Sequence, residues 1–207
     1  MMSITHPRHS LLSLLPLLLP LLSACSTQPS QATHFYRLAV PDAHKVEIRQ
    51  TAPGKAQQPR VGLGPVRLAS YLDRPQIVSR ITPYRIELND FHHWAGTLQE
   101  NIVLALTDAL RTELGQAAVI GYPWHRAIQP LYQVALDVTR FDAEAGQVLL
   151  QARWTLVKPA SDELLAVREA RIAEPLQGTG PEALVAAASR AMVQLAQQLA
   201  AALQPYL

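Results

Sequence analysis

The amino end of the chain restricts most strongly what the rest can fold into. Residues 11–22 are almost entirely leucine and follow a short, mildly basic start that contains Arg8. Twelve residues of helix would measure only about 18 Å, against roughly 30 Å of bilayer hydrocarbon. Pro16 and Pro20 also oppose a continuous helix there. This pattern is typical of an export signal, so residues 1–24 are predicted to be a signal peptide outside the folded domain.

The signal ends beside Cys25, the single cysteine of the chain. Residues 22–25, Leu-Ser-Ala-Cys, resemble the lipobox of bacterial lipoproteins, in which cleavage precedes a cysteine that is then acylated, for example with palmitate. A lone cysteine in an exported protein has no internal disulfide partner, and lipidation explains it better than chance does. We therefore predict lipidation at Cys25 and a tether over residues 25–33. Ser26 follows the cysteine, and in enteric-type bacteria a serine at this position favours sorting to the outer membrane, whereas an aspartate favours retention in the inner membrane. We therefore expect a protein that is anchored in the outer membrane and faces the periplasm.

The remaining residues, 34–207, are predicted to form one α/β domain. Apolar residues make up 49% of the chain and charged residues 16%, which is ordinary for a domain with a sizeable core. Alternating apolar residues predict strands, and apolar residues three and four apart predict helices. The expected strands cover residues 34–40, 60–66, 132–139, 148–156 and 164–172, and the expected helices cover residues 91–114 and the stretch that Pro181 opens. We expect a mixed sheet with an antiparallel meander and two long packed helices.

Local signals suggest where these elements begin and end. Asn89 or Asp90 is expected to cap the first helix, and Gly115 to follow its last turn. Thr179 and Glu182 have the spacing of a capping box at the second helix. Residues 142–146 suit a hairpin turn, and residues 50–59 suit a loop.

No motif in the sequence indicates catalysis, a cofactor or a metal. Gly62 and Gly64 lack the third glycine of a dinucleotide fingerprint, and Pro65 removes a backbone donor. His92 and His93, expected at the start of the first helix, would point about 100° apart and make poor joint ligands. The chain has no nucleophile elbow and no cluster of basic residues for nucleic acid. We therefore expect a protein that is not an enzyme.

Two segments carry side chains suited to contacts. Tyr71, Asp73 and Arg74 offer a ring, an acceptor and a bidentate donor within four residues. Tyr122 and Trp124 flank a proline in an aromatic turn. These five residues are our candidates for partner binding. The alternative is an internal role, as a loop clamp for the first segment and as core cover for the second.

The ordered segments resemble the PqiC/YmbA family of ABC-type transport auxiliary lipoproteins over nearly the whole mature chain. The matching pieces are residues 35–38, 61–66, 68–80, 88–95, 98–110, 122–124, 137–141 and Trp154. The stretch from Tyr71 to Val78 is the most specific of them. The loop at residues 50–59 departs from the family pattern, which leaves the local contacts there open.

The resemblance implies an auxiliary-lipoprotein domain over residues 34–207 that works beside an MCE-domain protein of the PqiB type and a PqiA-type inner-membrane protein. Lipid would move between the two membranes, which supports envelope integrity, and this chain would attach the MCE tunnel to the outer membrane. Because such partners are ring assemblies, a homo-oligomeric ring is also expected. Three other functions stay open at this point: a lipid carrier, an outer-membrane assembly auxiliary and, without motif support, a lipid-anchored hydrolase.

Overall fold

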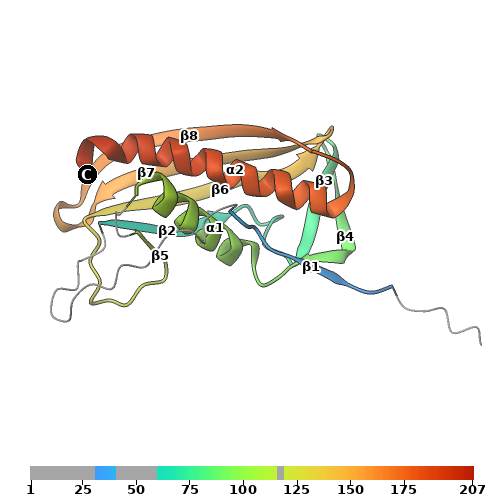
Figure 1. Ribbon diagram of the computed structural model, residues 1–207, viewed down its shortest axis with the longest axis horizontal. Coiled ribbons are helices and arrows are strands. Elements are labelled where there is room, and N and C mark those ends of the chain that lie inside the picture. Colours follow the sequence, from blue (N-terminus) through green and yellow to red (C-terminus); the bar gives the residue numbers. More distant parts are fainter. Residues whose placement is uncertain (1–30, 41–59, 116–118) are drawn as a thin grey trace, which may run out of the picture. The chain divides into compact units, whose positions relative to one another are not determined.

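The computed structural model describes residues 31–40, 60–115 and 119–207, and residues 33–207 form one compact unit. Cys25, most of the tether and the loop predicted at residues 50–59 lie outside the described residues. The strands are β1 (His34–Tyr36), β2 (Val61–Leu68), β3 (Gln76–Thr82), β4 (Arg85–Trp94), β5 (Val119–Gly121), β6 (Tyr132–Glu144), β7 (Gln147–Lys158) and β8 (Glu163–Pro175). The helices are α1 (Leu98–Glu113) and α2 (Gly180–Leu203), with short 3-10 turns at Pro159–Ser161 and Gln204–Tyr206 (Figure 1).

All eight strands belong to one mixed sheet, and β6 is its centre. On one side β6 pairs antiparallel with β7, and β7 pairs antiparallel with β8, so the predicted meander is confirmed. On the other side β6 pairs in parallel with β2 along its first half and with β3 at Ala143. β5 continues the sheet beyond β2, whereas β4 and β1 continue it beyond β3. The predicted α/β class, a single domain with a mixed sheet and two helices, is confirmed.

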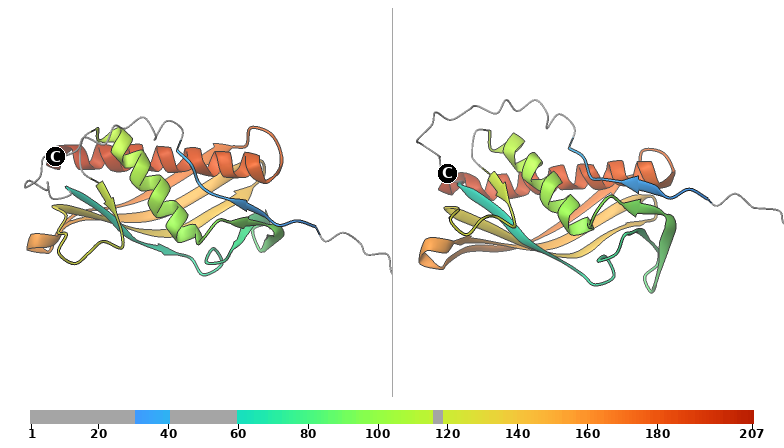
Figure 2. Two further views of the ribbon diagram at one scale, coloured as in Figure 1. Left: turned by 60° about the horizontal axis from the view of Figure 1, so that its bottom comes forward. Right: turned by 90° about the horizontal axis from the view of Figure 1, so that it is seen from below.

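Both helices cover the same face of the sheet (Figure 2). The inward positions of β6 alternate along the strand and are buried at Val134, Leu136 and Val138. Five alanines are among the residues that α2 buries, and such small side chains allow helix and sheet to approach closely. Among the described residues, no helix is both long enough and apolar enough to cross a membrane.

The prediction for the start of the first helix was wrong. Residues 91–94 have helical spacing, but they complete β4, which forms an antiparallel hairpin with β3. Gly96, with φ of +86°, separates this strand from the helix, and Thr97 is the N-cap in place of Asn89 or Asp90. His92 and His93 therefore lie in a strand. At the other end of α1 the prediction was right: Gly115 has φ of +64° just beyond the helix.

Two turn and cap predictions also need correction. The β6–β7 turn consists of Ala145 and Gly146, with φ of +49° and +78°, so Asp142 is part of the strand before it. Positive φ at both central residues matches the right-handed twist of the strands that the turn joins. Thr179 is the N-cap of α2, but its side chain makes no capping hydrogen bond. The capping box lies instead at α1, where Thr97 and Glu100 each bond the other's backbone at 3.1 Å.

Thr97→Ala should lower the free energy of unfolding by about 1 kcal/mol, because the mutant leaves a helix-terminal N–H without its acceptor. Urea denaturation of the two proteins measures the difference. Thr112→Ala is the matched control, since the Thr112 hydroxyl bonds a carbonyl one turn back on the exposed side of α1. This control should change stability by only a few tenths of a kcal/mol. Equal losses in both variants would contradict the role of the cap.

Candidate functional site

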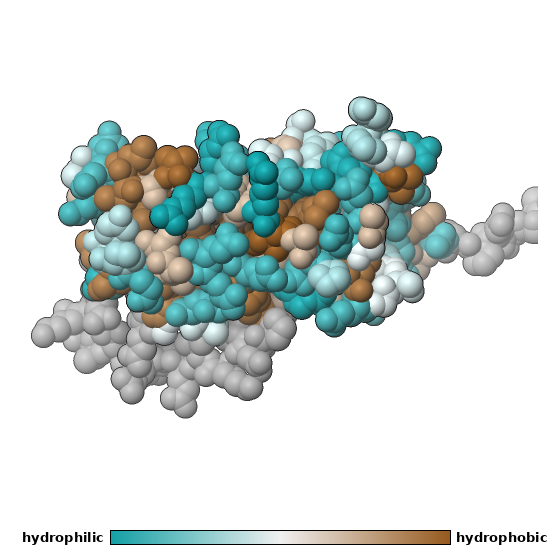
Figure 3. Space-filling model, turned by 90° about the horizontal axis from the view of Figure 1, so that it is seen from above, coloured by the Kyte–Doolittle hydropathy of each residue, from teal (hydrophilic) through white to brown (hydrophobic). Residues whose placement is uncertain are grey.

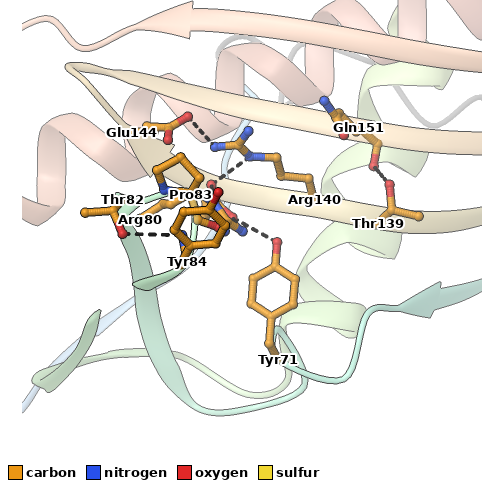
Figure 4. Close-up of polar contacts among 10 residues, drawn as sticks. Tyr71, Arg80, Thr82, Pro83, Tyr84, Thr139, Arg140, Glu144 and Gln151 are labelled. Carbon is orange, nitrogen blue, oxygen red and sulfur yellow. Dashed lines mark hydrogen bonds and ion pairs between the residues drawn. The ribbon is translucent and has the colours of Figure 1, made fainter. Parts of the chain in front are cut away.

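A buried carboxylate, Asp142, organises the polar contacts near the end of β6. Figure 4 shows Tyr71, Arg80 and Arg140 gathered around this place. The Tyr71 hydroxyl donates to its Oδ2 at 2.8 Å, and Arg80 Nη2 donates to the same oxygen at 2.8 Å. Arg140 Nε donates to Oδ1 at 2.9 Å. Arg140 also reaches Glu144 through Nη2 at 2.7 Å. We call these five residues the Asp142 cluster.

The cluster compensates a charge that would otherwise be expensive to bury. The Asp142 side chain is 0% exposed, and the side chains of Arg80 and Arg140 are each 18% exposed. An isolated carboxylate in such a place would be strongly destabilising, whereas two guanidinium groups and a phenol saturate it. Burial raises the pKa of Tyr71 to about 12, and the hydrogen bond to Asp142 adds to that shift. The Arg80 guanidinium also lies over the Tyr71 ring, 5.6 Å from its centroid.

Because its members come from separate parts of the chain, the cluster holds those parts together. Tyr71 lies in the loop before β3, Arg80 lies in β3, and Arg140, Asp142 and Glu144 lie in β6. The cluster therefore ties the β3–β4 hairpin to the central strand at the point where the backbone pairing between β3 and β6 is limited to Ser79 and Ala143. The charged side chains of the cluster pair with one another, so we assign the cluster a structural role.

A second polar group joins β8 to the helix above it. Glu174, which is buried, accepts from Arg190 Nε at 3.0 Å and from the side chain of Gln194. Among the described residues, the other ion pairs are on the surface: Arg67 with Asp137, Arg111 with Asp108, and Glu169 with Arg153 and Arg171. In the described ranges, no three His, Cys, Asp or Glu side chains lie close enough to hold a metal ion.

The described surface has a groove of about 850 Å³ beside α1. Three segments line it: residues 37–40 after β1, residues between Ala95 and Asp108 at the start and in the middle of α1, and Tyr122–Pro123 after β5. The lining mixes apolar side chains such as Leu104, which is 67% exposed, with charged ones such as Asp108. Such a mixture suits a polypeptide segment better than a fully apolar ligand. We call it the α1 groove, and it is the candidate functional site.

The five predicted partner residues do not lie together. Tyr71 points inward to Asp142, Asp73 is exposed, and Arg74 is half-buried. Tyr122 is 44% exposed, lines the α1 groove and meets Trp124 edge to face at 5.4 Å. Trp124 is half-buried and closes over Gly62, where an added Cβ would lie 2.7 Å from its ring. Partner binding by these residues stays a prediction, and the geometry makes Tyr122 the best placed.

Sequence reasoning missed two kinds of residue. Arg80, Arg140 and Glu144 were not singled out, although alternating charges at residues 140, 142 and 144 share one face of a strand. Leu104 was also missed, although the sequence held a signal for it. A leucine outside the apolar face of a helix is expected to be exposed, and an exposed leucine is a candidate for a contact with a partner. The contact between Tyr71 and Asp142, which are 71 residues apart, had no local signal.

These features define a class: a one-domain mixed sheet with two helices on one face and an open groove beside the first helix. The sequence matches the ABC-type transport auxiliary lipoprotein component family over residues 43–200. The chain belongs to this family, and is thereby a transport auxiliary lipoprotein. The resemblance to PqiC/YmbA-type lipoproteins seen in the sequence is confirmed.

Solved structures share the fold at low sequence identity. A crystal structure of an uncharacterised protein is 17% identical, with a TM-score of 0.66, and the match covers 83% of this chain and 98% of that one. A DUF330 protein from Xanthomonas campestris, XCC0632, is 18% identical with a TM-score of 0.60 and the same coverage. The PelC dodecamer from Paraburkholderia phytofirmans is a weaker match, 12% identical with a TM-score of 0.42 over 72% of this chain and 93% of that one. No curated protein matches the sequence.

Asp142→Asn should lower the free energy of unfolding by about 2–4 kcal/mol, because two half-buried arginines lose their shared countercharge. The matched control is Asp137→Asn, which removes a carboxylate paired with Arg67 where the two side chains are 41% and 76% exposed. That exposed pair should contribute less than about 1 kcal/mol. Chemical denaturation of both variants tests the ranking, and a control as damaging as Asp142→Asn would contradict it.

Tyr71 should make stability fall in alkaline solution. The folded protein keeps this phenol neutral to a higher pH than the unfolded chain does, so its contribution is complete below pH 10 and is lost as pH rises from 10.0 toward about 12. Urea midpoints across this window should decline less steeply in Tyr71→Phe, which has no phenol to ionise. At neutral pH the same variant should be less stable by about 1 kcal/mol. Parallel declines in both proteins would exclude Tyr71 as the source.

Proposed function

We propose that the mature chain is a non-enzymatic outer-membrane lipoprotein subunit of an MCE-type, PqiABC-like lipid transport system. Acyl chains on Cys25 would anchor it, and the folded domain would dock an MCE-domain protein of the PqiB type on the periplasmic side, with a PqiA-type partner in the inner membrane. The observation that carries this proposal is family membership over residues 43–200 in a chain whose apolar signal ends at Leu-Ser-Ala-Cys.

The α1 groove supports the docking role. Leu104 and Tyr122 are 67% and 44% exposed, and both line the groove, so apolar area stays open to a partner. Arg37 and Asp108 place opposite charges in the lining. An apolar centre beside charged groups is the usual composition of a protein interface. Docking here would bury Leu104 without rearranging the core, since the side chain already points outward.

A lipid carrier is the second candidate, because about 850 Å³ lies within the range of small-molecule sites. The charged lining counts against it, since an acyl chain would leave Arg37, Glu100 and Asp108 beside hydrocarbon. Native mass spectrometry of the detergent-released protein separates the two candidates. A bound phospholipid that Leu104→Asp removes would favour the carrier over the docking subunit.

Leu104→Asp should reduce recovery of an MCE-domain protein when tagged protein is pulled down from crosslinked cells, because a carboxylate would replace the apolar centre of the groove. Cys25→Ala should also reduce recovery, since the domain would lose its place on the membrane. Leu164→Asp is the matched control: Leu164 is 60% exposed, lies in β8 and is not part of the groove lining.

Recovery of an outer-membrane barrel protein in place of an MCE protein would move the assignment to an assembly auxiliary. Equal losses in Leu104→Asp and Leu164→Asp would remove the groove from the docking role. Blue-native sizing of the same extract tests the homo-oligomeric ring, which a monomer alone would contradict. In the described part of the sheet, β1, β5 and β8 are the terminal strands, and pairing of two such edges between copies is compatible with a head-to-tail ring.

A further inference from the structure

The tip of the β3–β4 hairpin presents apolar side chains that nothing in the described part of the chain covers. Tyr84 is 99% exposed and Ile81 is 44% exposed, and Pro83 between them is also exposed. Aromatic and branched side chains that stay exposed on a tight turn do not contribute the stabilising free energy that their burial would give. The side of the protein on which β8 lies shows apolar patches among hydrophilic side chains (Figure 3), and Leu164 and Val167 of β8 are 60% and 51% exposed. Tyr84, at 99%, is the most exposed of the large apolar side chains in the described residues.

The tip is held in a fixed form. Arg80 Nη1 donates to the Pro83 carbonyl at 3.4 Å, and the Tyr84 N–H donates to Thr82 Oγ1 at 3.3 Å (Figure 4). Arg80 is itself bound by Asp142 at the base of the hairpin. The tip is thus connected through one side chain to the central strand. Because the turn is organised before any contact forms, binding there would lose little conformational entropy.

The chemistry of the tip fits a lipid surface. Tyrosine is enriched at the boundary between bilayer and water, where its ring enters the apolar side and its hydroxyl stays wet. Residues 79–86 contain Arg80 and Arg85 and no acidic residue, and Arg85 is exposed. An exposed arginine beside an exposed tyrosine suits a headgroup layer that carries phosphate.

The proposed anchor lies within reach of the same surface. Cys25 precedes His34 by nine residues, which span at most about 30 Å. β1 pairs in parallel with β4 at His34 and His92. From His92 back to Arg85 at the tip is seven residues of strand, about 23 Å or less. The tether is therefore long enough for the acyl chains and the hairpin tip to meet one bilayer together.

We propose that the β3–β4 tip, residues 81–85, rests in the headgroup layer of the membrane that holds the Cys25 acyl chains, with Tyr84 as the inserted side chain. This inference rests on the proposed lipid anchor. The tip supplies a second point of contact, and two points restrict how the domain can swing. The domain is thereby oriented on the membrane, and the α1 groove keeps a constant direction toward its partner.

The test uses the acylated mature protein, which begins at Cys25, with Tyr84→Trp, reconstituted in vesicles of phosphatidylglycerol and phosphatidylcholine brominated on its acyl chains. Trp94 and Trp154 are buried and Trp124 is half-buried, so the wild-type protein supplies the background emission. The control is Leu164→Trp. Leu164 lies opposite Val157 of β7, which in turn lies opposite Gln133 of β6. Gln133 is ten residues along β6 from Ala143, the residue at which β3 pairs with β6, so the two positions are about 33 Å apart along the strand.

The proposal expects the Tyr84→Trp emission to be quenched and shifted to shorter wavelength, while the Leu164→Trp emission stays at its value in unbrominated vesicles. Adding Arg85→Glu to Tyr84→Trp should reduce the quenching, because it places an acid at an anionic surface. Protein that floats with the vesicles but leaves the Tyr84→Trp emission unquenched would overturn the tip contact and leave the anchor intact. Equal quenching of both tryptophans would also overturn it. Protein that fails to float, with no acyl mass on Cys25, would overturn the anchor and this inference with it.

Discussion

The burial of one face of β6 against the helices is the constraint on which the rest of the structure depends. Val134, Leu136 and Val138 are each 1% exposed and face the helical layer. Each large apolar side chain removed from water contributes about 1.5–3 kcal/mol, so this row outweighs any single polar contact. Because β6 also carries the backbone pairing of β7, β2 and β3, the helices that cover it determine the position of nearly every other strand.

The Asp142 cluster follows from that arrangement. Near the end of β6, the outward face of the strand meets Tyr71 in the loop before β3. At this place the strand carries a carboxylate that has no access to water, and Arg80, Arg140 and Tyr71 satisfy it. A polar cluster is less stabilising per residue than apolar packing, but it works only in one geometry. In this protein that geometry fixes the base of the β3–β4 hairpin, and through Arg80 it also fixes the tip.

The proposed functional surfaces consist of apolar side chains that the core does not bury, such as Leu104 in the groove and Tyr84 at the hairpin tip. The α1 groove forms because residues 37–40 lie beside α1: the Leu38 N–H donates to Asn101 Oδ1 at 3.1 Å, and the Ala39 N–H to Ser189 Oγ at 3.1 Å. The first bond joins this segment to α1 and the second joins it to α2, and Leu104 in the groove lining is 67% exposed. Family membership makes the chain a transport auxiliary lipoprotein. The groove and the hairpin tip are the surfaces on which our proposals for the partner and the membrane depend.

The sequence by itself determined the class of fold, the meander, α2 and most of α1, because periodicities of two and of three to four residues are local properties of the chain. It also predicted the signal and the lipidated cysteine from residues 1–25, which lie outside the described residues. Local spacing misled where two structures share a pattern. Residues 91–94 match a helical face, and only pairing with β1 and with Gln76 of β3 makes them a strand. Only the tertiary structure decided that Asp142 is buried and that Tyr71 reaches it. It also decided that Leu104 and Tyr122 line one groove, because each of these contacts joins residues that are distant along the chain and carry no local signal.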